Sequence, residues 1–252
     1  MSPGPPRSEA KNHAYWDRVS DEYQGAHGAG LERDAMGWGV WRIAEAELGA
    51  LGDVAGRDVL ELGCGGAQWA CGLAAAGARV VGLDLSRAQL RHARERTARL
   101  DRAVPLLQGS ATAVPLADAS FDVVMSDHGA TTFADPHGVV PEVARLLRPG
   151  GRFAFAITSP IRDACWREAD DAVGDRLVND YFGLHEVEDA EQVCFQLPYG
   201  AWISLFARSG LVVEALHELR PREDATTSYE GFVPLDWARR YPAENLWVLR
   251  KR

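Results

Sequence analysis

Val59-Leu60-Glu61-Leu62-Gly63-Cys64-Gly65-Gly66-Ala67 is the stretch that decides the fold of this 252-residue chain. Its apolar run ends in glycines, a helical segment follows, and a second apolar run, Val80–Ser86, carries Asp84 near its end. This order predicts a strand-helix-strand unit that binds a nucleotide at its first turn. The glycines allow the backbone to turn at positive φ without a Cβ atom in the way.

Three features of this unit indicate which ligand it holds. Asp84 follows the turn by about 20 residues, where an acid can accept hydrogen bonds from ribose hydroxyls. The helix predicted over 68–76 directs free N–H groups toward the same place. Glu61 lies two residues before the first glycine, where it would repel a diphosphate but would tolerate the cationic amino end of a methionine moiety. Glu61 therefore argues against a dinucleotide.

At this turn the sequence resembles the class I S-adenosylmethionine-dependent methyltransferases, specifically the small-molecule type of the menaquinone and ubiquinone methyltransferases. The resemblance extends from about Asn12 to the C-terminus and is weaker between 160 and 198. It implies an α/β fold with a Rossmann-like, seven-stranded, mostly parallel sheet and helices on both faces. It also implies an N-terminal helical lid, an insertion after strand five, and a reversed strand over 245–249.

The resemblance implies which residues bind S-adenosylmethionine. The glycine turn would contact the methionine part, and Asp84 and Gln89 would bind the ribose. The family often carries an acid after strand three to receive the adenine amino group, whereas Gly109-Ser110-Ala111 offers only a hydroxyl here. The predicted cofactor-binding residues are Tyr15, Tyr23, Trp41, Glu61, Gly63, Cys64, Gly65, Asp84, Leu85, Gln89, Ser110, Ala111 and Asp127.

Aromatic side chains of the N-terminal region allow two interpretations. Tyr15 and Tyr23 lie on a helix predicted over 9–24, where they either reach the cofactor or pack the helix against the domain. Trp41 precedes a helix predicted to end at residue 48, and its indole either stabilises a sulfonium by cation–π attraction or packs in the core. The glycine-rich stretch 25–30 is predicted to be a flexible hinge.

The strand predicted over 121–126 ends in Asp127-His128, at the edge where open α/β sheets bind their ligands. His128 titrates near neutrality and is the predicted general base for an acceptor hydroxyl or amine. Methyl transfer from a sulfonium is a direct displacement that positioning alone can promote, so a structural or cofactor-binding role is the alternative for His128. Asp127 is predicted to bind the cofactor or to support a residue that does.

Residues 160–200 are predicted to form an acceptor-binding insertion. The segment alternates acids with large aromatic side chains, and a loop of this length usually has a function or helices of its own. Trp166, Tyr181, Phe182 and Tyr199 would line an aromatic acceptor pocket. The acids fit a cationic acceptor and a solvated lid surface equally well.

Composition limits the partners of the protein. The formal net charge of −9 and the pI near 5.3 argue against nucleic acid. No apolar stretch approaches the roughly 18 residues of a membrane span, and the N-terminus has no secretory apolar region, so we expect a cytoplasmic protein without membrane contact. The four cysteines lack the paired spacing of a metal site, so none is expected. Residues 1–8 are predicted to be a disordered tail and 9–252 one domain, of which 9–50 forms the lid.

The sequence predicts methyl transfer from S-adenosylmethionine to a small, partly apolar or aromatic metabolite by direct in-line displacement. One alternative is a non-catalytic S-adenosylmethionine-binding protein, and another is a different nucleotide-cofactor enzyme such as an NAD-dependent dehydrogenase. The residues do not distinguish oxygen, nitrogen and carbon as the methylated atom. They fit a monomer and a homodimer alike.

Overall fold

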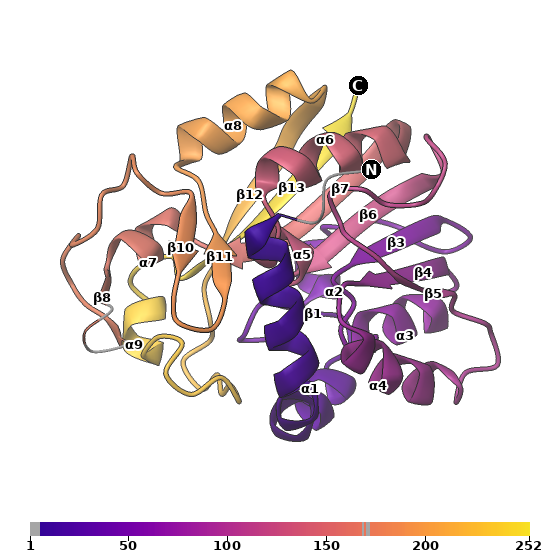
Figure 1. Cartoon of the computed structure of the whole chain (residues 1–252), viewed down its shortest axis with the longest axis horizontal. Helices are drawn as coiled ribbons and strands as arrows, with labels where there is room; N and C mark the ends of the chain where they lie inside the picture. Colours follow the sequence, from indigo (N-terminus) through magenta and orange to yellow (C-terminus); the bar gives the residue numbers. More distant parts are fainter. Residues whose placement is uncertain (1–5, 168, 170–171) are drawn as a thin grey trace.

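A computed structural model of the chain describes residues 6–252 with the exception of 168, 170 and 171. Its centre is a seven-stranded sheet in the order β12-β13-β7-β6-β3-β4-β5 (Figure 1). The strands from β5 to β7 run parallel, whereas β13 is antiparallel to both β7 and β12. The sheet consists of β3 (Asp58–Leu62), β4 (Arg79–Asp84), β5 (Leu106–Gln108), β6 (Phe121–Asp127), β7 (Leu147–Thr158), β12 (Leu211–Leu219) and β13 (Glu244–Lys251).

Helices and short strand pairs surround this sheet. The helices are α1 (Arg7–Arg33), α2 (Glu45–Leu48), α3 (Gln68–Ala75), α4 (Arg87–Thr97), α5 (Ala130–Phe133), α6 (Pro136–Leu146), α7 (Pro160–Ala164), α8 (Tyr199–Arg208) and α9 (Leu235–Ala238). The paired short strands are β1 (Gly37–Trp38) with β2 (Ile43–Ala44), β8 (Trp166–Arg167) with β9 (Ala172–Val173), and β10 (Glu186–Glu188) with β11 (Val193–Phe195). Among the described helices, none combines the length and apolar character needed to cross a membrane.

Alternate side chains of the central strands point into two separate core clusters, as the pleat of a strand requires. Val59 and Val123 pack with side chains of α3 and α4 on one face of the sheet. Leu60 and Val124 pack with side chains of α6 and α8 on the other face. Because helices cover both faces, the ends of the strands are left for a ligand.

The predicted fold class is confirmed, including the mostly parallel sheet and the reversed strand, which is β13. Some boundaries differ. β6 ends at Asp127, one residue later than predicted. The helix predicted to end at residue 48 begins only at Glu45, because the preceding residues form β2 and pair with β1.

Helix α1 is longer than predicted. It begins at Arg7, inside the predicted tail, and continues to Arg33, while residues 1–5 of that tail lie outside the described residues. The prediction of a flexible hinge over 25–30 is wrong, because this stretch is helical. Gly28 is buried, and a Cβ atom there would lie 3.7 Å from the guanidinium of Arg96 on α4. Packing against α4 therefore outweighs the low helix propensity of glycine.

Hydrogen bonds hold α1 across the carboxyl ends of the strands (Figure 1). Asp17 accepts hydrogen bonds from Ser86 Oγ at 2.7 Å and from Ala88 N at 3.1 Å, which joins α1 to the start of α4. Asn12 donates to Val193 O at 2.8 Å and accepts from Val193 N at 2.7 Å, as a neighbouring strand would. α1 thus connects the β4–α4 turn to the hairpin formed by β10 and β11.

The turn after β3 depends on a close backbone contact with the turn after β6. Gly63 has a φ of +71°, and a Cβ atom there would lie 2.3 Å from the amide nitrogen of Ala130. A Cβ atom at Gly129 would lie 2.6 Å from the carbonyl oxygen of Gly63. The two turns therefore meet through their backbones.

We expect Gly63→Ala to lower the free energy of unfolding more than Gly150→Ala. Both positions have positive φ, so both substitutions carry a penalty of about 1–2 kcal/mol. Nothing lies within 4 Å of a Cβ atom at Gly150, whereas the overlap at Gly63 adds about 1–3 kcal/mol. Denaturant unfolding of the two variants measures the difference, and equal losses would show that the backbone contact contributes nothing.

Candidate functional site

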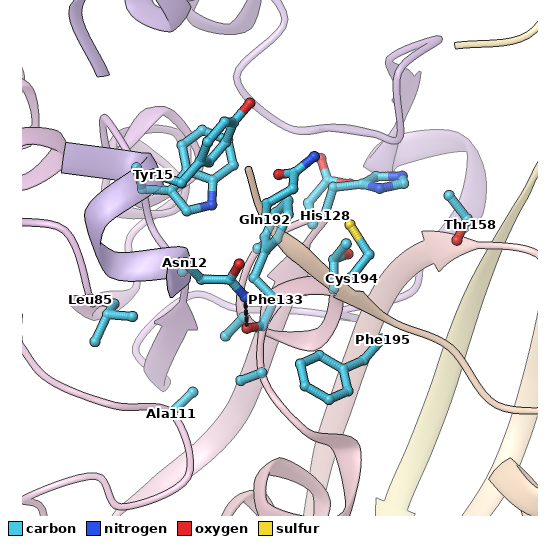
Figure 2. Close-up of a pocket in the computed structure, with 18 of the residues that line it drawn as sticks. Asn12, Tyr15, Leu85, Ala111, His128, Phe133, Thr158, Gln192, Cys194 and Phe195 are labelled. Carbon is cyan, nitrogen blue, oxygen red and sulfur yellow. Dashed lines mark hydrogen bonds between the residues drawn. The ribbon is translucent and has the colours of Figure 1, made fainter. Parts of the chain in front are cut away.

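A cavity of about 960 Å³ lies at the carboxyl ends of the parallel strands (Figure 2). Every parallel strand places residues in its lining at or just after its end. Asn12 of α1 and Phe195 of β11 also line it. The strand ends contribute Glu61, Gly63, Asp84, Ser110, Asp127, His128 and Thr158.

Asp84 is fixed by the backbone of the glycine turn. Its Oδ2 accepts a hydrogen bond from Gly65 N at 2.8 Å, and its Oδ1 accepts one from Ser86 N at 2.8 Å. Burial raises the pKa of Asp84 to about 6, although these two N–H groups act in the opposite direction. Because a carboxylate has about four acceptor positions, two remain for a ligand that carries paired hydroxyls.

Glu61 is buried at the end of β3 and faces the cavity. Burial raises its pKa well above the usual range, and the nearby carboxylates of Asp84 and Asp127 raise it further. Its Oε2 is buried and has no partner among the described residues. An unpaired buried carboxyl oxygen is costly unless a ligand supplies a donor, so this position fits an ammonium group. The thiol of Cys64 lies nearby, and burial raises its pKa, which keeps it protonated.

Helix α1 supplies two polar contacts that the sequence did not predict. Ser110 Oγ hydrogen-bonds the carboxylate of Glu9, which also lines the cavity. An acid therefore lies beside Ser110 after all, but it comes from α1. Gln24 donates to Gln89 Oε1 at 2.9 Å and accepts from Gln68 Nε2 at 2.9 Å, so its side chain bridges α3 and α4 beside the glycine turn.

Tyr15 and Tyr23 both line the cavity and also pack against other rings. The ring of Tyr15 meets Trp16 edge to face, with centroids 5.4 Å apart. The hydroxyl of Tyr23 lies 2.7 Å from that of Tyr229, whose ring stacks on His27 at 4.2 Å. The two interpretations of these tyrosines are therefore compatible.

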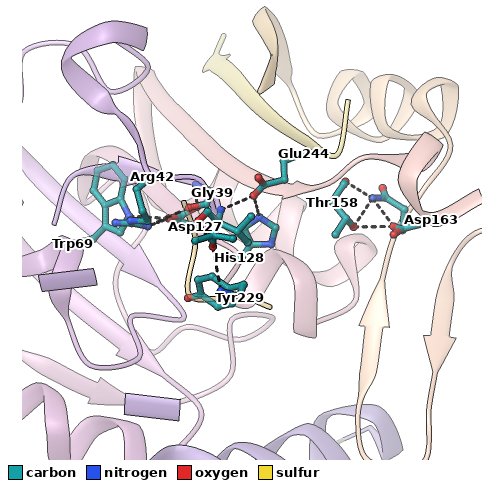
Figure 3. Close-up of polar contacts among 12 residues, drawn as sticks. Gly39, Arg42, Trp69, Asp127, His128, Thr158, Asp163, Tyr229 and Glu244 are labelled. Atoms are coloured by element: carbon teal, nitrogen blue, oxygen red, sulfur yellow. Dashed lines mark hydrogen bonds and ion pairs between the residues drawn. The ribbon is translucent and has the colours of Figure 1, made fainter. Parts of the chain in front are cut away.

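Asp127 is occupied by groups of the chain itself (Figure 3). Its Oδ1 accepts from Gly39 N at 2.9 Å, and its Oδ2 accepts from Arg42 Nη1 at 3.0 Å and Trp69 Nε1 at 3.0 Å. These contacts favour a supporting role for Asp127. Trp69 also lines the cavity near the glycine turn, where Trp41 was the predicted indole.

His128 forms a partly buried pair with Glu244 of β13, with 2.6 Å between Nε2 and Oε1 (Figure 3). Burial lowers the pKa of His128, but the hydrogen bond and charge of Glu244 outweigh it and raise the pKa above 6.5 overall. Glu244 is 1% exposed and also accepts from Val40 N at 2.9 Å. No described residue hydrogen-bonds Nδ1 of His128, so this nitrogen is left for a ligand.

Beyond His128, the cavity is lined by polar side chains of β7, of α7 and of Gln196, which follows β11. Asp163 Oδ2 accepts from Thr158 Oγ1 at 2.8 Å and from Gln196 Nε2 at 3.2 Å. The guanidinium of Arg162 lies over the ring of Trp166, with Cζ 4.0 Å from the centroid. Trp166 thus lines the cavity as predicted for an acceptor residue.

The other three aromatic residues predicted to bind the acceptor do not line the cavity. Phe182 is 87% exposed. Tyr181 accepts a hydrogen bond from Tyr199 N at 3.0 Å. Tyr199 begins α8, packs in the core beside Trp247, and accepts from Asn245 Nδ2 at 2.9 Å. The prediction that these three side chains line an acceptor pocket therefore does not fit the cavity.

Trp41 is the predicted cofactor residue that lies outside the cavity lining. Its side chain packs in a separate cluster with Cys165, Val233 and Trp237, which agrees with the packing interpretation. The other predicted cofactor residues all line the cavity, and their contacts with the cofactor stay a prediction. They are Tyr15, Tyr23, Glu61, Gly63, Cys64, Gly65, Asp84, Leu85, Gln89, Ser110, Ala111 and Asp127.

Asp135, His137 and His185 form a cluster that cysteine spacing could not reveal. One ligand-type atom from each lies within 4.8 Å of the others. Asp135 caps α6 through His137 N at 2.9 Å and lies 3.3 Å from His185 Nε2. These contacts explain the cluster without an ion.

Comparison with known proteins supports a single family. Residues 60–155 match the family described as methyltransferase domain. The chain is 38% identical to demethylmenaquinone methyltransferase of Clavibacter sepedonicus over 116 residues. This alignment covers 46% of each chain. The chain is 32% identical over 165 residues to 27-O-demethylrifamycin SV methyltransferase of Amycolatopsis mediterranei, which covers 64% of this chain and 56% of that one. The chain thus spans about half the length of these relatives.

A solved structure agrees with these sequence matches over a larger part of the chain. The S-adenosylmethionine-dependent methyltransferase from Mesorhizobium loti aligns with a TM-score of 0.67 and 25% identity. The alignment covers 82% of this chain and 96% of that one. The similarity therefore includes most of the sheet and its helices.

The burial of Asp84 predicts a pH-dependent stability. Its pKa rises from 3.8 to about 6 on folding, so between these values the folded state holds a proton that the unfolded chain has released. The stability contributed by Asp84 is full at low pH and is lost as the pH rises through about 6. Asp84→Asn removes this titration. We therefore compare the free energies of unfolding of the variant and the unsubstituted chain. The value for the variant minus that for the unsubstituted chain should rise by about 2–3 kcal/mol between pH 4 and pH 7.

Denaturant unfolding across this pH range measures that difference. Asp224→Asn is the matched control, because Asp224 is exposed and its replacement should leave the difference flat. A flat difference for Asp84→Asn as well would contradict the assigned burial of its charge.

Proposed function

We propose that this chain, which belongs to the class I S-adenosylmethionine-dependent methyltransferases, transfers a methyl group from S-adenosylmethionine to a small, partly apolar or aromatic acceptor. One observation carries the proposal: a single cavity has the glycine turn and Asp84 at one end and the His128–Glu244 pair further along. The relatives named for demethylmenaquinone and demethylrifamycin support an acceptor of small-molecule size.

The residues at the glycine turn fit the donor. Glu61 offers an unpaired carboxyl oxygen to the ammonium of the methionine part. Asp84 has acceptor positions left for the two ribose hydroxyls. Glu9, which lies against Ser110, is assigned to the adenine amino group. The chain thus provides a partner for the ammonium, the ribose hydroxyls and the adenine amino group of the cofactor.

The acceptor half of the reaction needs a proton acceptor and a fixed orientation. When bound, S-adenosylmethionine supplies an activated methyl group on a positively charged sulfur. His128 takes the acceptor proton on Nδ1, while Nε2 stays hydrogen-bonded to Glu244. The negative charge of Glu244 stabilises the imidazolium that forms, so Glu244 is a positioning residue.

Calorimetric titration with S-adenosylmethionine, S-adenosylhomocysteine and NAD tests the donor site. The two adenosyl compounds should bind with micromolar affinity, and NAD should not bind. Asp84→Ala should weaken cofactor binding by about 1–3 kcal/mol, because the ribose hydroxyls lose their acceptor. Binding of NAD alone would overturn the proposal. Cofactor binding without methylation of any acceptor in a broad screen would favour a non-catalytic protein.

The pH profile of turnover tests the His128–Glu244 pair. With any acceptor found in that screen, kcat should rise with pH through a pKa above 6.5, because only the neutral imidazole accepts a proton. Glu244→Gln should move this rise to lower pH, because Glu244 raises the pKa of His128. His128→Asn suits the φ of +48° and should lower kcat about 10²-fold, with unchanged affinity for S-adenosylhomocysteine.

Two results would contradict this assignment. If Glu244→Gln leaves the pH profile in place, the rise belongs to another group. If His128→Asn weakens S-adenosylhomocysteine binding instead of kcat, His128 binds the cofactor.

A further inference from the structure

Arg162 is a cation in the cavity lining that the reaction described above does not use. Its guanidinium lies between two aromatic side chains, with Cζ 4.0 Å from the ring centroid of Trp166 and 5.1 Å from that of Phe232. Such stacking engages the faces of the guanidinium and leaves its edge for hydrogen bonds. The two rings also exclude water from the charge, which strengthens its attraction for an anion.

The hydrogen-bonding capacity of this guanidinium is mostly unused. Nη1 donates to Asp163 Oδ1 at 2.9 Å. Nη2 reaches only the carbonyl oxygen of Phe232 at 3.5 Å, which is longer than an ordinary hydrogen bond. Nε has no partner among the described residues. Of five N–H donors, one therefore has a good acceptor.

Asp163 orients Arg162, and both of its carboxylate oxygens accept hydrogen bonds. Its second oxygen accepts hydrogen bonds from Thr158 and Gln196. The amide oxygen of Gln196 in turn accepts from Leu197 N and Trp202 Nε1, each at 2.8 Å. A buried network of this kind fixes the position of the guanidinium, as a binding site requires.

Arg162 lies on the acceptor side of the cavity, near the proposed base. Phe232 contacts both groups: its ring meets His128 edge to face with centroids 6.0 Å apart, and it lies beside Arg162. In Figure 3 the Thr158–Asp163 network stands to one side of the His128–Glu244 pair. An acceptor that presents its hydroxyl or amine to His128 can therefore extend along Phe232 to Arg162.

Several acids also line the cavity, but most of them are occupied. Glu188 pairs with Lys11 at 2.8 Å. Asp189 accepts from the amides of Glu191 and Gln192, and Asp180 accepts from Phe182 N. These contacts tie the acids to neighbouring parts of the chain. Arg162 forms an ion pair with Asp163 at 2.9 Å, but among the described residues its other donors have no acceptor at an ordinary hydrogen-bond distance.

We propose that Arg162 binds a carboxylate of the acceptor, so that the methylated molecule is a planar aromatic or conjugated acid. The carboxylate accepts hydrogen bonds from the Arg162 edge, the planar part lies along Phe232, and the group to be methylated faces His128. This inference rests on the proposed function, because it places the acceptor relative to the base. It also decides between the two interpretations of the acidic insertion: the acids serve the lid, and the acceptor is an anion.

Binding of matched acids and amides to the full chain, saturated with S-adenosylhomocysteine, tests this inference. The probes are 4-hydroxybenzoate and 6-hydroxy-2-naphthoate, each paired with its carboxamide, which has the same shape without the charge. Each acid should bind about tenfold more tightly than its amide, because a charge-assisted hydrogen bond is roughly twice as strong as a neutral one. Quenching of tryptophan fluorescence reports binding, since Trp166 lies against the guanidinium.

Variants of Arg162 separate recognition from structural support. Arg162→Met keeps an apolar side chain between the rings and should reduce the preference for acids to less than about twofold. Arg162→Lys keeps the charge without the planar edge and should give an intermediate preference. Arg208→Met, at an exposed position on α8, is the control and should preserve the full preference. Both Arg162 variants should bind S-adenosylhomocysteine as the unsubstituted chain does.

The outcomes distinguish this inference from the proposed function. A chain that binds no S-adenosylhomocysteine contradicts the proposed function itself. If the chain binds S-adenosylhomocysteine but binds neither acid, or binds the acids no more tightly than their amides, the role of Arg162 is overturned. Retention of the preference in Arg162→Met overturns that role as well.

Discussion

The geometry of the site depends on the backbone contact between the turns that follow β3 and β6. Because neither Gly63 nor Gly129 has room for a Cβ atom, the two turns lie closer than side chains would allow. Ser126 reinforces the contact by donating to the carbonyl oxygen of Leu62 at 2.8 Å. The contact places the turn assigned to the donor directly beside His128. Parallel strand order supplies the rest, because the carboxyl ends of β4, β5 and β7 meet at the same edge.

The acids of the candidate site fall into two groups, according to whether another side chain of the protein offsets their charge. Glu61 and Asp84 form no ion pair with a described residue, and burial raises the pKa of both. Asp127 instead pairs with the guanidinium of Arg42, and Glu244 hydrogen-bonds the imidazole of His128. Glu61 and Asp84 lie where a positively charged cofactor would bind. Binding of that cofactor would therefore offset the free-energy cost of burying their charge in the free protein. Asp127 and Glu244 instead hold Arg42 and His128 in fixed positions.

The glycine turn and Asp84 could be identified from the sequence because they belong to one strand-helix-strand unit with regular spacing, whereas the contact of Glu9 with Ser110 could not, because Glu9 lies far away on α1. The acceptor half could not, since Glu244 follows His128 by 116 residues and no local pattern joins them. Periodicity also cannot tell which of several indoles faces a cavity, so Trp41 was predicted at the site and Trp69 was missed. The aromatic composition of the insertion is similarly ambiguous, because a tyrosine such as Tyr199 can begin a helix and pack in the core. Strand order and the reversed strand followed from the family resemblance, whereas element ends depended on tertiary contacts such as those of α1.

The position of α1 has a consequence for the rate of product release. Gln24 bridges Gln68 and Gln89 beside the glycine turn, and Asn12 holds the other part of the helix to β11. A molecule bound beneath α1 cannot leave on this side until these hydrogen bonds break. Asp17 and Glu9 also bond α1 to the rest of the chain, so opening requires that several bonds of about 1 kcal/mol each break together. Under the proposed function, the residence time of the demethylated cofactor would then follow how often α1 opens. Because Asn12 also bonds the insertion, the proposed function would couple departure of the cofactor and exchange of the acceptor through this one helix.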